Sequence, residues 1–232
     1  MVDGTISYFH DSRATTVKPY AFYDCNDLHT VIVENATSIG TYGFYSCEKL
    51  ATLYAPKATS VGGSGLVSCI GLSDVTLGIT GTLSSNCTVG TYLRNNKNLT
   101  KVAFPECPYI QNEALAYCSN LSQVSFPKAS VIGTGAFRNN AAMSYAEFPA
   151  VTTVSGLAFY SCKALKELRM PECLTVNQSR AFEQCPALET LYLPKCSFFH
   201  ASGCLVETNG LKSVTVGFST TVSNAFANKG AL

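Results

Sequence analysis

The dominant feature of this sequence is a repeat with a period of about 22 residues, a length typical of solenoid proteins. Residues 21–33 are AFYDCNDLHTVIV and residues 43–55 are GFYSCEKLATLYA, with Phe, Tyr, Cys and Leu at matching places. The aromatic or leucine position that opens each unit recurs through most of the 232-residue chain, at Phe22, Phe44, Leu66, Leu93, Leu115, Phe137, Phe159 and Phe182. A unit of this length cannot enclose a core alone and has to stack on its neighbours. The repeat therefore predicts a solenoid.

Each unit carries further apolar residues in a fixed order. A Leu or Met follows the first column after six residues, at Leu28, Leu50, Leu72, Leu99, Leu121, Met143, Leu165 and Leu188. Apolar residues then alternate with outward positions, as at Val31 and Val33, which predicts a short strand with one buried face. A Pro or Gly after most strands, such as Pro56, ends the strand because proline lacks an amide hydrogen. The segment that carries the Phe is short, and we expect a helical or 3₁₀ turn there.

The units form one predicted domain. We assign residues 1–16 to an N-terminal flank. Residues 17–232 form a single predicted solenoid of about nine units, each of roughly 22–23 residues. The spacing from Leu66 to Leu93 is longer than the others and indicates an insertion within 78–90. The final unit is incomplete at Leu232, and an unfinished unit would expose an apolar end, which favours a piece of a longer protein.

The 11 cysteines fall mainly in two repeat columns. One column, three residues after the Phe position, alternates Cys with Asn; its members are Cys25, Cys47, Cys69, Asn96, Cys118, Asn140, Cys162, Cys185 and, in a degenerate unit, Asn209. Catalytic thiols are not interchangeable with Asn, so we expect this column to cap backbone groups. The other column contains Cys107, Cys173 and Cys196. An odd number of thiols cannot all pair, and parallel side-chain vectors disfavour disulfides. We expect mostly free, buried thiols, with Cys87 as the most exposed.

No catalytic, metal or cofactor site is predicted. His200 lies between Cys196 and Cys204 and is the one base near a thiol, but repeat columns favour a structural role for these cysteines. His10 and His29 lack metal-ligand spacing. With a net charge of +1 and a charged content of 13%, the chain lacks the positive electrostatic field that would attract the phosphate backbone of a nucleic acid. We therefore expect no enzyme activity, no cofactor, no nucleic-acid partner and no membrane insertion of this segment.

The Cys-or-Asn position, followed by xxLxxVxxP and IGxxAF, resembles the BspA-like leucine-rich repeat family, the bacterial surface-antigen and treponemal type, over about residues 17–232. The resemblance implies a leucine-rich-repeat right-handed β/α superhelix with short parallel strands on its concave face. It also implies a cell-surface or secreted binding module of a host-associated bacterium. The implied role is adhesion to a protein or glycan, with host extracellular matrix and mucin among the expected partners. A structural spacer array that presents another domain of a larger protein is the alternative.

Outward strand positions supply the candidate binding residues. They lie two and four residues after each Leu, and aromatic or charged side chains gather there at the two ends of the repeat array, as is typical of interfaces. The candidates for partner binding are Ile32, Tyr54, Tyr145, Glu147, Glu167, Arg169 and Tyr192. A second group of tyrosines flanks the Phe turns, and we expect it to pack; its members are Tyr20, Tyr23, Tyr42, Tyr45 and Tyr160.

Overall fold

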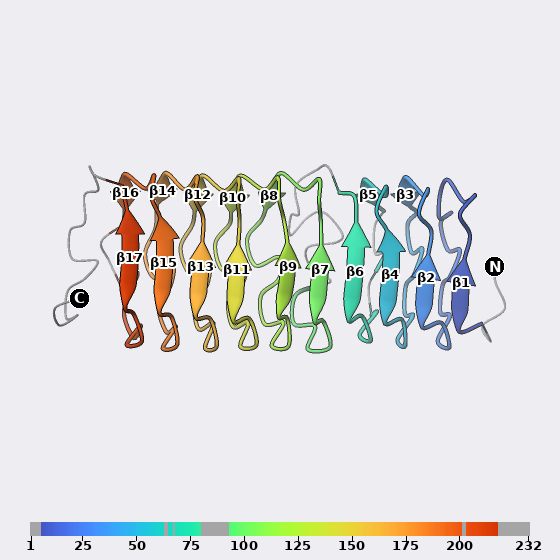
Figure 1. The fold of residues 1–232 in the computed structure, drawn as a ribbon. Helices are drawn as coiled ribbons and strands as arrows, with labels where there is room; N and C mark the ends of the chain where they lie inside the picture. Colours follow the sequence, from blue (N-terminus) through green and yellow to red (C-terminus); the bar gives the residue numbers. More distant parts are fainter. Residues whose placement is uncertain (1–5, 63–64, 67, 80–92, 201–202, 218–232) are drawn as a thin grey trace.

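The chain winds into a solenoid in which each coil adds one strand to a long parallel ladder (Figure 1). The structure is a computed structural model, and it describes residues 6–62, 65–66, 68–79, 93–200 and 203–217. The strands of the long ladder are β1 (Tyr8–His10), β2 (Thr30–Ile32), β4 (Thr52–Ala55), β6 (Asp74–Leu77), β7 (Lys101–Ala103), β9 (Gln123–Ser125), β11 (Tyr145–Glu147), β13 (Glu167–Arg169), β15 (Thr190–Leu193) and β17 (Ser213–Val216). The predicted parallel-strand solenoid is confirmed.

The register of the ladder follows the sequence repeat. Thr30 pairs with Thr52, and Thr52 pairs with Asp74, so equivalent positions of neighbouring units lie side by side. The ladder comprises a six-stranded sheet from β1 to β9 and a four-stranded sheet from β11 to β17, which meet at the β9–β11 contact. β1 lies within the segment 1–16 and pairs with β2. Every outward column therefore runs along the whole strand face.

A second set of shorter strands lies beside the first ladder, after the Pro or Gly that ends most of the main strands, and it forms a two-stranded and a five-stranded sheet. Its strands are β3 (Ser38–Ile39), β5 (Ser60–Val61), β8 (Tyr109–Ile110), β10 (Val131–Ile132), β12 (Thr153–Val154), β14 (Thr175–Val176) and β16 (Phe198–Phe199). All of its pairings are parallel, as between Ile132 and Val154. The second residue of each strand is buried. These strands therefore close part of the core.

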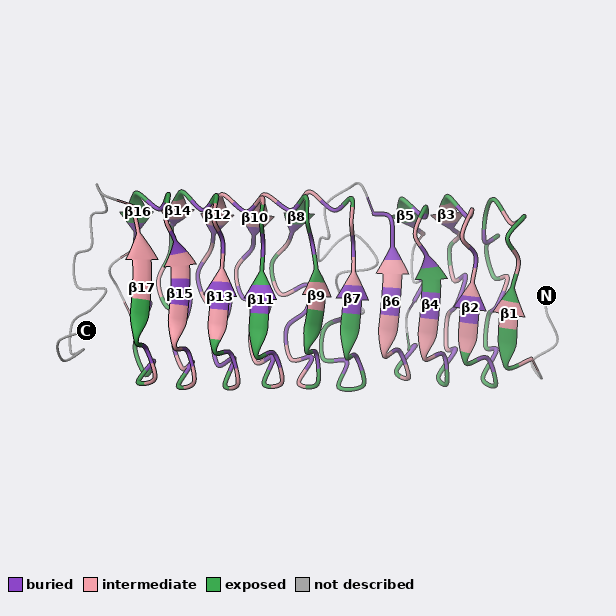
Figure 2. Cartoon of the chain, in the orientation of Figure 1, coloured by how far each residue is buried: buried purple, intermediate pink, exposed green. Residues whose placement is uncertain are grey.

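The core is a continuous column of apolar side chains through the coils. Figure 2 marks the buried residues in purple along successive strands. The ring of Phe137 stacks on that of Phe159, with centroids 5.4 Å apart, and Phe159 stacks on Phe182 at 6.0 Å. All three side chains are fully buried. Burying one such ring contributes about 1.5–3 kcal/mol relative to leaving it exposed. Coil-to-coil stacking of this column is what holds the outward faces in position.

The turns that carry the Phe column differ from the predicted helical or 3₁₀ turns. They are successive hydrogen-bonded turns, as in residues 19–24 and 41–46. Two residues in such a turn have positive φ: Tyr20 and Asp24 both at 58°, Tyr42 at 55° and Ser46 at 56°. A right-handed helix needs negative φ at every residue, so these two positions interrupt it. Some backbone amides of the turns bond instead to the next coil, as Phe22 does to the carbonyl of Gly43 at 2.8 Å.

The Cys column caps backbone carbonyls, as predicted. The Cys47 thiol donates to the carbonyl of Phe22 at 2.9 Å, and the Cys162 thiol donates to that of Phe137 at 3.1 Å. Cys69, Cys118 and Cys185 repeat this contact. All ten cysteines in the described residues are buried, as expected, whereas Cys87 lies outside those residues. Burial raises the pKa of the Cys47 thiol to about 12, which makes it a poor nucleophile at neutral pH.

Two positions of this column correct or refine the prediction. Thr208, not Asn209, occupies the buried place in the degenerate unit: it is fully buried and its hydroxyl donates to the Leu205 carbonyl at 2.6 Å, whereas Asn209 is exposed. The prediction was one position off because this unit lacks the Phe from which the column is counted. Asn96 caps amides, with its Oδ1 accepting from Asn98 at 3.0 Å. Within the part of the chain that the structure describes, the side-chain amide of buried Asn140 has no hydrogen-bond partner.

Candidate binding surface

The predicted binding residues lie on the strand face in two separate groups. Ile32 of β2 pairs with Tyr54 of β4, so their side chains are neighbours. Tyr54 is exposed and Ile32 is half-buried. The other five candidates lie on β11, β13 and β15, beyond the intervening strands β6, β7 and β9. The structure therefore does not unite all seven residues in one site.

The second group is a set of neighbouring side chains on three adjacent strands, which we call the strand-face network. Its members are Tyr145, Glu147, Glu167, Arg169 and Tyr192. The Tyr145 hydroxyl donates to Glu147 at 2.8 Å, and Arg169 Nη1 donates to Glu167 at 3.0 Å. The Arg169 guanidinium also lies over the Tyr192 ring, 4.4 Å from its centroid. Pairing of Glu147 with Arg169 and of Arg169 with Tyr192 in the ladder brings these side chains together.

The polar contacts of the network shift the pKa values of two members. The hydrogen bond to Glu167 raises the pKa of Arg169, and the hydrogen bond to Glu147 raises the pKa of Tyr145. At neutral pH the network carries two carboxylates and one guanidinium, all at least partly exposed to solvent. Side chains that already hold each other lose less rotamer freedom when a partner binds. The network is therefore a pre-ordered, weakly acidic surface with two aromatic rings.

The outward positions of the strand face between the two groups carry small, polar or charged side chains and no aromatic ring. Its charged contact is the ion pair between Asp74 and Lys101, with the carboxylate oxygen 3.3 Å from Nζ. Gln123 and Ser125 of β9 are exposed, and their neighbours on β7 are Lys101 and Ala103. This stretch of outward positions offers no aromatic ring to a partner.

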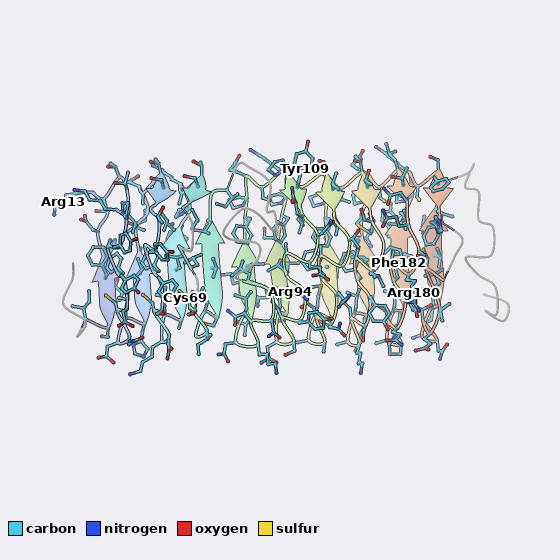
Figure 3. The ribbon with its side chains drawn as sticks, turned by 180° about the vertical axis from the view of Figure 1, so that it is seen from behind. Arg13, Cys69, Arg94, Tyr109, Arg180 and Phe182 are labelled. Atoms are coloured by element: carbon cyan, nitrogen blue, oxygen red, sulfur yellow. The ribbon has the colours of Figure 1, made fainter. Side chains whose placement is uncertain are left out.

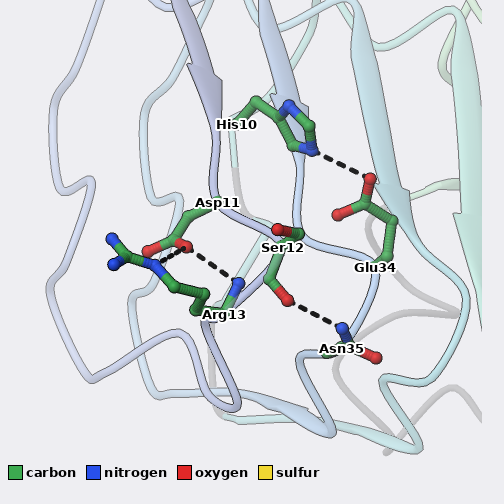
Figure 4. A network of polar contacts seen from close by, with 6 residues as sticks. All are labelled: His10, Asp11, Ser12, Arg13, Glu34 and Asn35. Carbon is green, nitrogen blue, oxygen red and sulfur yellow. Dashed lines mark hydrogen bonds and ion pairs between the residues drawn. The ribbon is translucent and has the colours of Figure 1, made fainter.

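The first coils carry a polar network of their own at the end of β1 (Figure 4). Glu34, which replaces the Pro or Gly of other units, lies 2.9 Å from His10 Nε2. Asp11 accepts from the Arg13 backbone amide at 2.9 Å, and Asn35 donates to the Ser12 carbonyl at 2.7 Å. In the described part of the chain, no group of three or more metal-ligating side chains comes together. We therefore assign this network to the first loop's structure.

The turn side, seen from behind in Figure 3, carries a charged cluster that the sequence reasoning missed. Arg94 and Arg138 both lie over the Tyr117 ring, at 5.6 and 4.8 Å from its centroid. Both arginines form ion pairs with Glu113, and Arg138 also donates to the Tyr117 hydroxyl. The only available signal was that Arg94 and Arg138 occupy equivalent positions two units apart. Tyr117 is fully engaged by its own chain.

Four of the five predicted packing tyrosines form a second aromatic group on the turn side, here called the tyrosine quartet: Tyr20, Tyr23, Tyr42 and Tyr45. Tyr20 stacks on Tyr42 with centroids 5.1 Å apart, and Tyr23 stacks on Tyr45 at 5.2 Å. The rings pack on each other, yet Tyr20 and Tyr23 remain 49% and 44% exposed. Among the described residues, Tyr160 has no ring contact with the quartet.

Within the described residues, no helix combines the length and the apolar character needed to cross a lipid bilayer. Cys196 and Cys204, the thiols that flank His200 in the sequence, are both fully buried. Burial raises the pKa of Cys204, which disfavours its thiolate.

The repeat architecture of this chain has counterparts among known proteins. The model of the BspA type leucine rich repeat region matches residues 7–107 and 108–232, with six copies. A leucine rich cell surface protein from Faecalibacterium prausnitzii A2-165 is similar, with 17% identity, a TM-score of 0.42 and coverage of 79% of this chain and 59% of that one. A leucine-rich repeat protein from Bacteroides ovatus ATCC 8483 has 15% identity, a TM-score of 0.42 and coverage of 91% and 67%.

The Treponema pallidum leucine rich repeat protein is also similar, with 20% identity, a TM-score of 0.33 and coverage of 87% of this chain and 66% of that one. No curated protein matches the chain. The family match spans nearly all of the sequence, including the segment 7–16 that contains β1. The chain belongs to the BspA-type leucine-rich repeat family.

Proposed function

We propose that this chain is a non-enzymatic binding module of a cell-surface or secreted protein, and that it recognises a protein or a glycan through its strand face. The observation that carries the proposal is the strand-face network. It groups two tyrosines and an arginine, which are residue types enriched at binding hot spots, on rigid neighbouring strands. Leucine-rich repeat proteins of this kind are typically binding scaffolds. The chain spans 59% of the length of the Faecalibacterium relative that it matches.

The geometry favours a partner that can exchange hydrogen bonds with carboxylates and stack on aromatic rings. Glu147 and Glu167 each accept one hydrogen bond within the network, so acceptor capacity remains for donors on a partner. The exposed Tyr145 ring supplies apolar area beside them. Host extracellular matrix proteins and mucins offer both kinds of group, and we propose them as the first partners to test.

The experiment is binding of the full chain to an array of matrix proteins, mucins and glycans. The test variant is Tyr145→Ala/Arg169→Ala/Tyr192→Ala, and the matched control is Thr76→Ala/Gln123→Ala/Ser125→Ala on the same face. We expect a specific signal that the test variant loses and the control keeps, with both variants folded by circular dichroism. A signal that survives in the test variant would refute the strand-face assignment.

A rigid spacer that presents another domain is the second candidate. It is favoured by ion pairs that join equivalent positions of adjacent coils, such as Lys49 with Asp27 at 2.8 Å and Lys212 with Glu189 at 2.9 Å. These pairs and the continuous core resist bending of the array. If the chain is a spacer, its repeats should bind none of the tested ligands specifically. The triple substitution should then leave the function of the complete protein unchanged.

A further inference from the structure

The tyrosine quartet differs from Tyr145 and Tyr117 in that its hydroxyl groups have no hydrogen-bond partner among the described residues. None of the four hydroxyl groups has a hydrogen bond among the described residues, and no cation of that part of the chain lies over any of the four rings. Tyr117, on the same side, has two arginines over its ring and a donor on its hydroxyl. The quartet is therefore not held in place by the charged contacts that engage Tyr117.

The backbone beneath the quartet is strained at two of its members. Tyr20 and Tyr42 have φ values of 58° and 55°, in the left-handed region that a bulky side chain rarely adopts. Every described unit has positive φ at this position, where the later units carry Glu113, Gly135, Leu157, Arg180 and Gly203. Positive φ is therefore a shared property of the repeat turn, which glycine adopts most easily but other residue types also adopt. Among the described units, two adjacent coils carry an aromatic side chain there, so the shared turn conformation places the rings of Tyr20 and Tyr42 on each other.

The geometry of the rings leaves apolar surface open. The two stacks have centroid separations of 5.1 and 5.2 Å, which is typical of offset stacking, and Tyr20 and Tyr23 keep 49% and 44% of their surface exposed. The Tyr42 ring makes angles of 65° with Tyr23 and 69° with Tyr45, so the two stacks meet at an angle. The result is a cluster of four phenol side chains in which Tyr20 and Tyr23 are the most exposed and Tyr42 and Tyr45 are half-buried.

We propose that the tyrosine quartet is a second binding site, distinct from the strand face, for a neutral β-linked oligosaccharide of glucose-type sugars. In such pyranoses the hydroxyl groups are equatorial, so both ring faces present axial C–H groups that pack on aromatic rings. The equatorial hydroxyls project from the sugar's rim and match the phenol groups of the quartet. A charged ligand would find no counter-ion among these four side chains. The stacked rings are pre-ordered, which lowers the entropy lost on binding.

The test is calorimetric titration of the full chain with cellohexaose and with N-acetylchitohexaose, both neutral β-linked hexamers. The test variant is Tyr20→Gly/Tyr42→Gly, which removes two rings and relieves the strain, so it is expected to fold. The matched control is Leu157→Gly, at the equivalent positive-φ position of another coil, with φ of 57°. We expect at least about tenfold weaker sugar binding in the test variant and unchanged binding in the control.

Three outcomes would overturn the proposal: no binding of either hexamer by the natural chain, equal binding by the tyrosine variant, or binding of a proline-rich peptide by the quartet without any binding of sugar. The last would assign the patch to a peptide, since proline rings also pack on aromatic side chains. The strand-face triple variant should keep its sugar binding. This separates failure of the present proposal from failure of the proposed strand-face function.

Discussion

The strand-face network and the tyrosine quartet are built from similar rings on one scaffold, but their polar groups are used differently. In the network, Tyr145 donates to a carboxylate and the Tyr192 ring lies under a guanidinium. In the quartet the rings contact one another, and among the described residues their hydroxyl groups have no hydrogen-bond partner. The comparison shows that one solenoid can carry a charged surface and an uncharged surface. The repeat fixes which positions are buried and apolar, whereas the outward positions can differ from unit to unit.

The largest expected effect tests whether the two surfaces depend on different parts of the core. Phe159 is fully buried and stacks between Phe137 and Phe182, near the coils that carry the network. Phe159→Ala should lower the free energy of unfolding by about 3–5 kcal/mol, through lost burial and a cavity. In a solenoid each coil contacts only its neighbours, so hydrogen exchange should accelerate most around β11–β15 and least around the quartet.

The matched substitution at the other end is Phe22→Ala, beneath the quartet. Phe22 stacks on Phe44 with centroids 5.0 Å apart. The hydrogen-exchange pattern of Phe22→Ala should be the reverse of that of Phe159→Ala, with the largest acceleration around β1–β4. Uniform acceleration along the whole chain in both variants would mean that the coils unfold as one unit and that the two surfaces are not locally supported.

Alkaline pH should weaken the support of both surfaces. Burial raises the pKa of Cys47 and Cys185 from the ordinary 9.0 to about 12, and that of Cys162 well above 9.0. Above pH 9 the thiols of the unfolded chain lose their protons, whereas the buried thiols of the folded chain keep theirs. The contribution of these thiols to the free energy of unfolding is therefore complete below pH 9 and is lost as the pH rises towards the pKa values of the folded state. Each thiol adds a slope of at most about 1.4 kcal/mol per pH unit.

The measurement is urea denaturation between pH 8 and pH 11 for the natural chain and for Cys162→Ala. The variant should be less stable at pH 8, because it lacks the thiol and its hydrogen bond to Phe137. Its stability should fall less steeply above pH 9. Parallel pH profiles would contradict a neutral, buried thiol at this position.

A smaller effect is expected from Asn140→Cys, in the coil where the network begins. The Asn140 side chain is fully buried, and its amide atoms have no hydrogen-bond partner among the described residues. A thiol at this place can donate to the Leu115 carbonyl in the pattern of Cys118 and Cys162, and it removes a buried unsatisfied amide. The free energy of unfolding should rise by about 1–2 kcal/mol.

Asn96→Cys is the control for Asn140→Cys, and it should have the opposite sign. The Asn96 Oδ1 accepts from the backbone amides of Asn98 and Leu99, at 3.0 and 3.2 Å, and a thiol cannot replace both bonds. Thermal denaturation of the two variants beside the natural chain decides the question. Equal changes in both would show that the column does not discriminate between Asn residues that cap and those that do not.

The buried columns were predictable because each coil imposes the same burial requirement at the same place. Leu28, Val31 and Cys47 could be assigned inward from spacing alone, and all three are buried. The turn conformation was not predictable, because Tyr20 and Tyr42 carry no glycine-like signal for positive φ.

The outward residues were predicted only in part. Their positions follow from alternation along the strand, but the contact of Arg169 with Tyr192 depends on the rotamers of both side chains. The charged cluster around Tyr117 joins residues from three coils, and no single-unit pattern indicates it. Thr208 was missed because its unit has lost the Phe that marks the start of the column count.

The smallest expected effect concerns the titration of one phenol, and it separates the two surfaces most directly. The Tyr145 hydroxyl donates to Glu147, and this bond raises the pKa of Tyr145 because ionisation would break it and place two negative charges together. Glu147→Gln removes the charge and should lower the pKa of Tyr145 towards its ordinary value of 10.0. Carbon-13 NMR of labelled tyrosine side chains measures this shift residue by residue. The same substitution should leave the neutral-pH chemical shifts of the quartet tyrosines unchanged, because they lie on the turn side of the coils and no hydrogen bond among the described residues joins them to Glu147. A shift in the quartet as well would mean that the two surfaces are electrostatically coupled through the core, and they could not then be treated as separate sites.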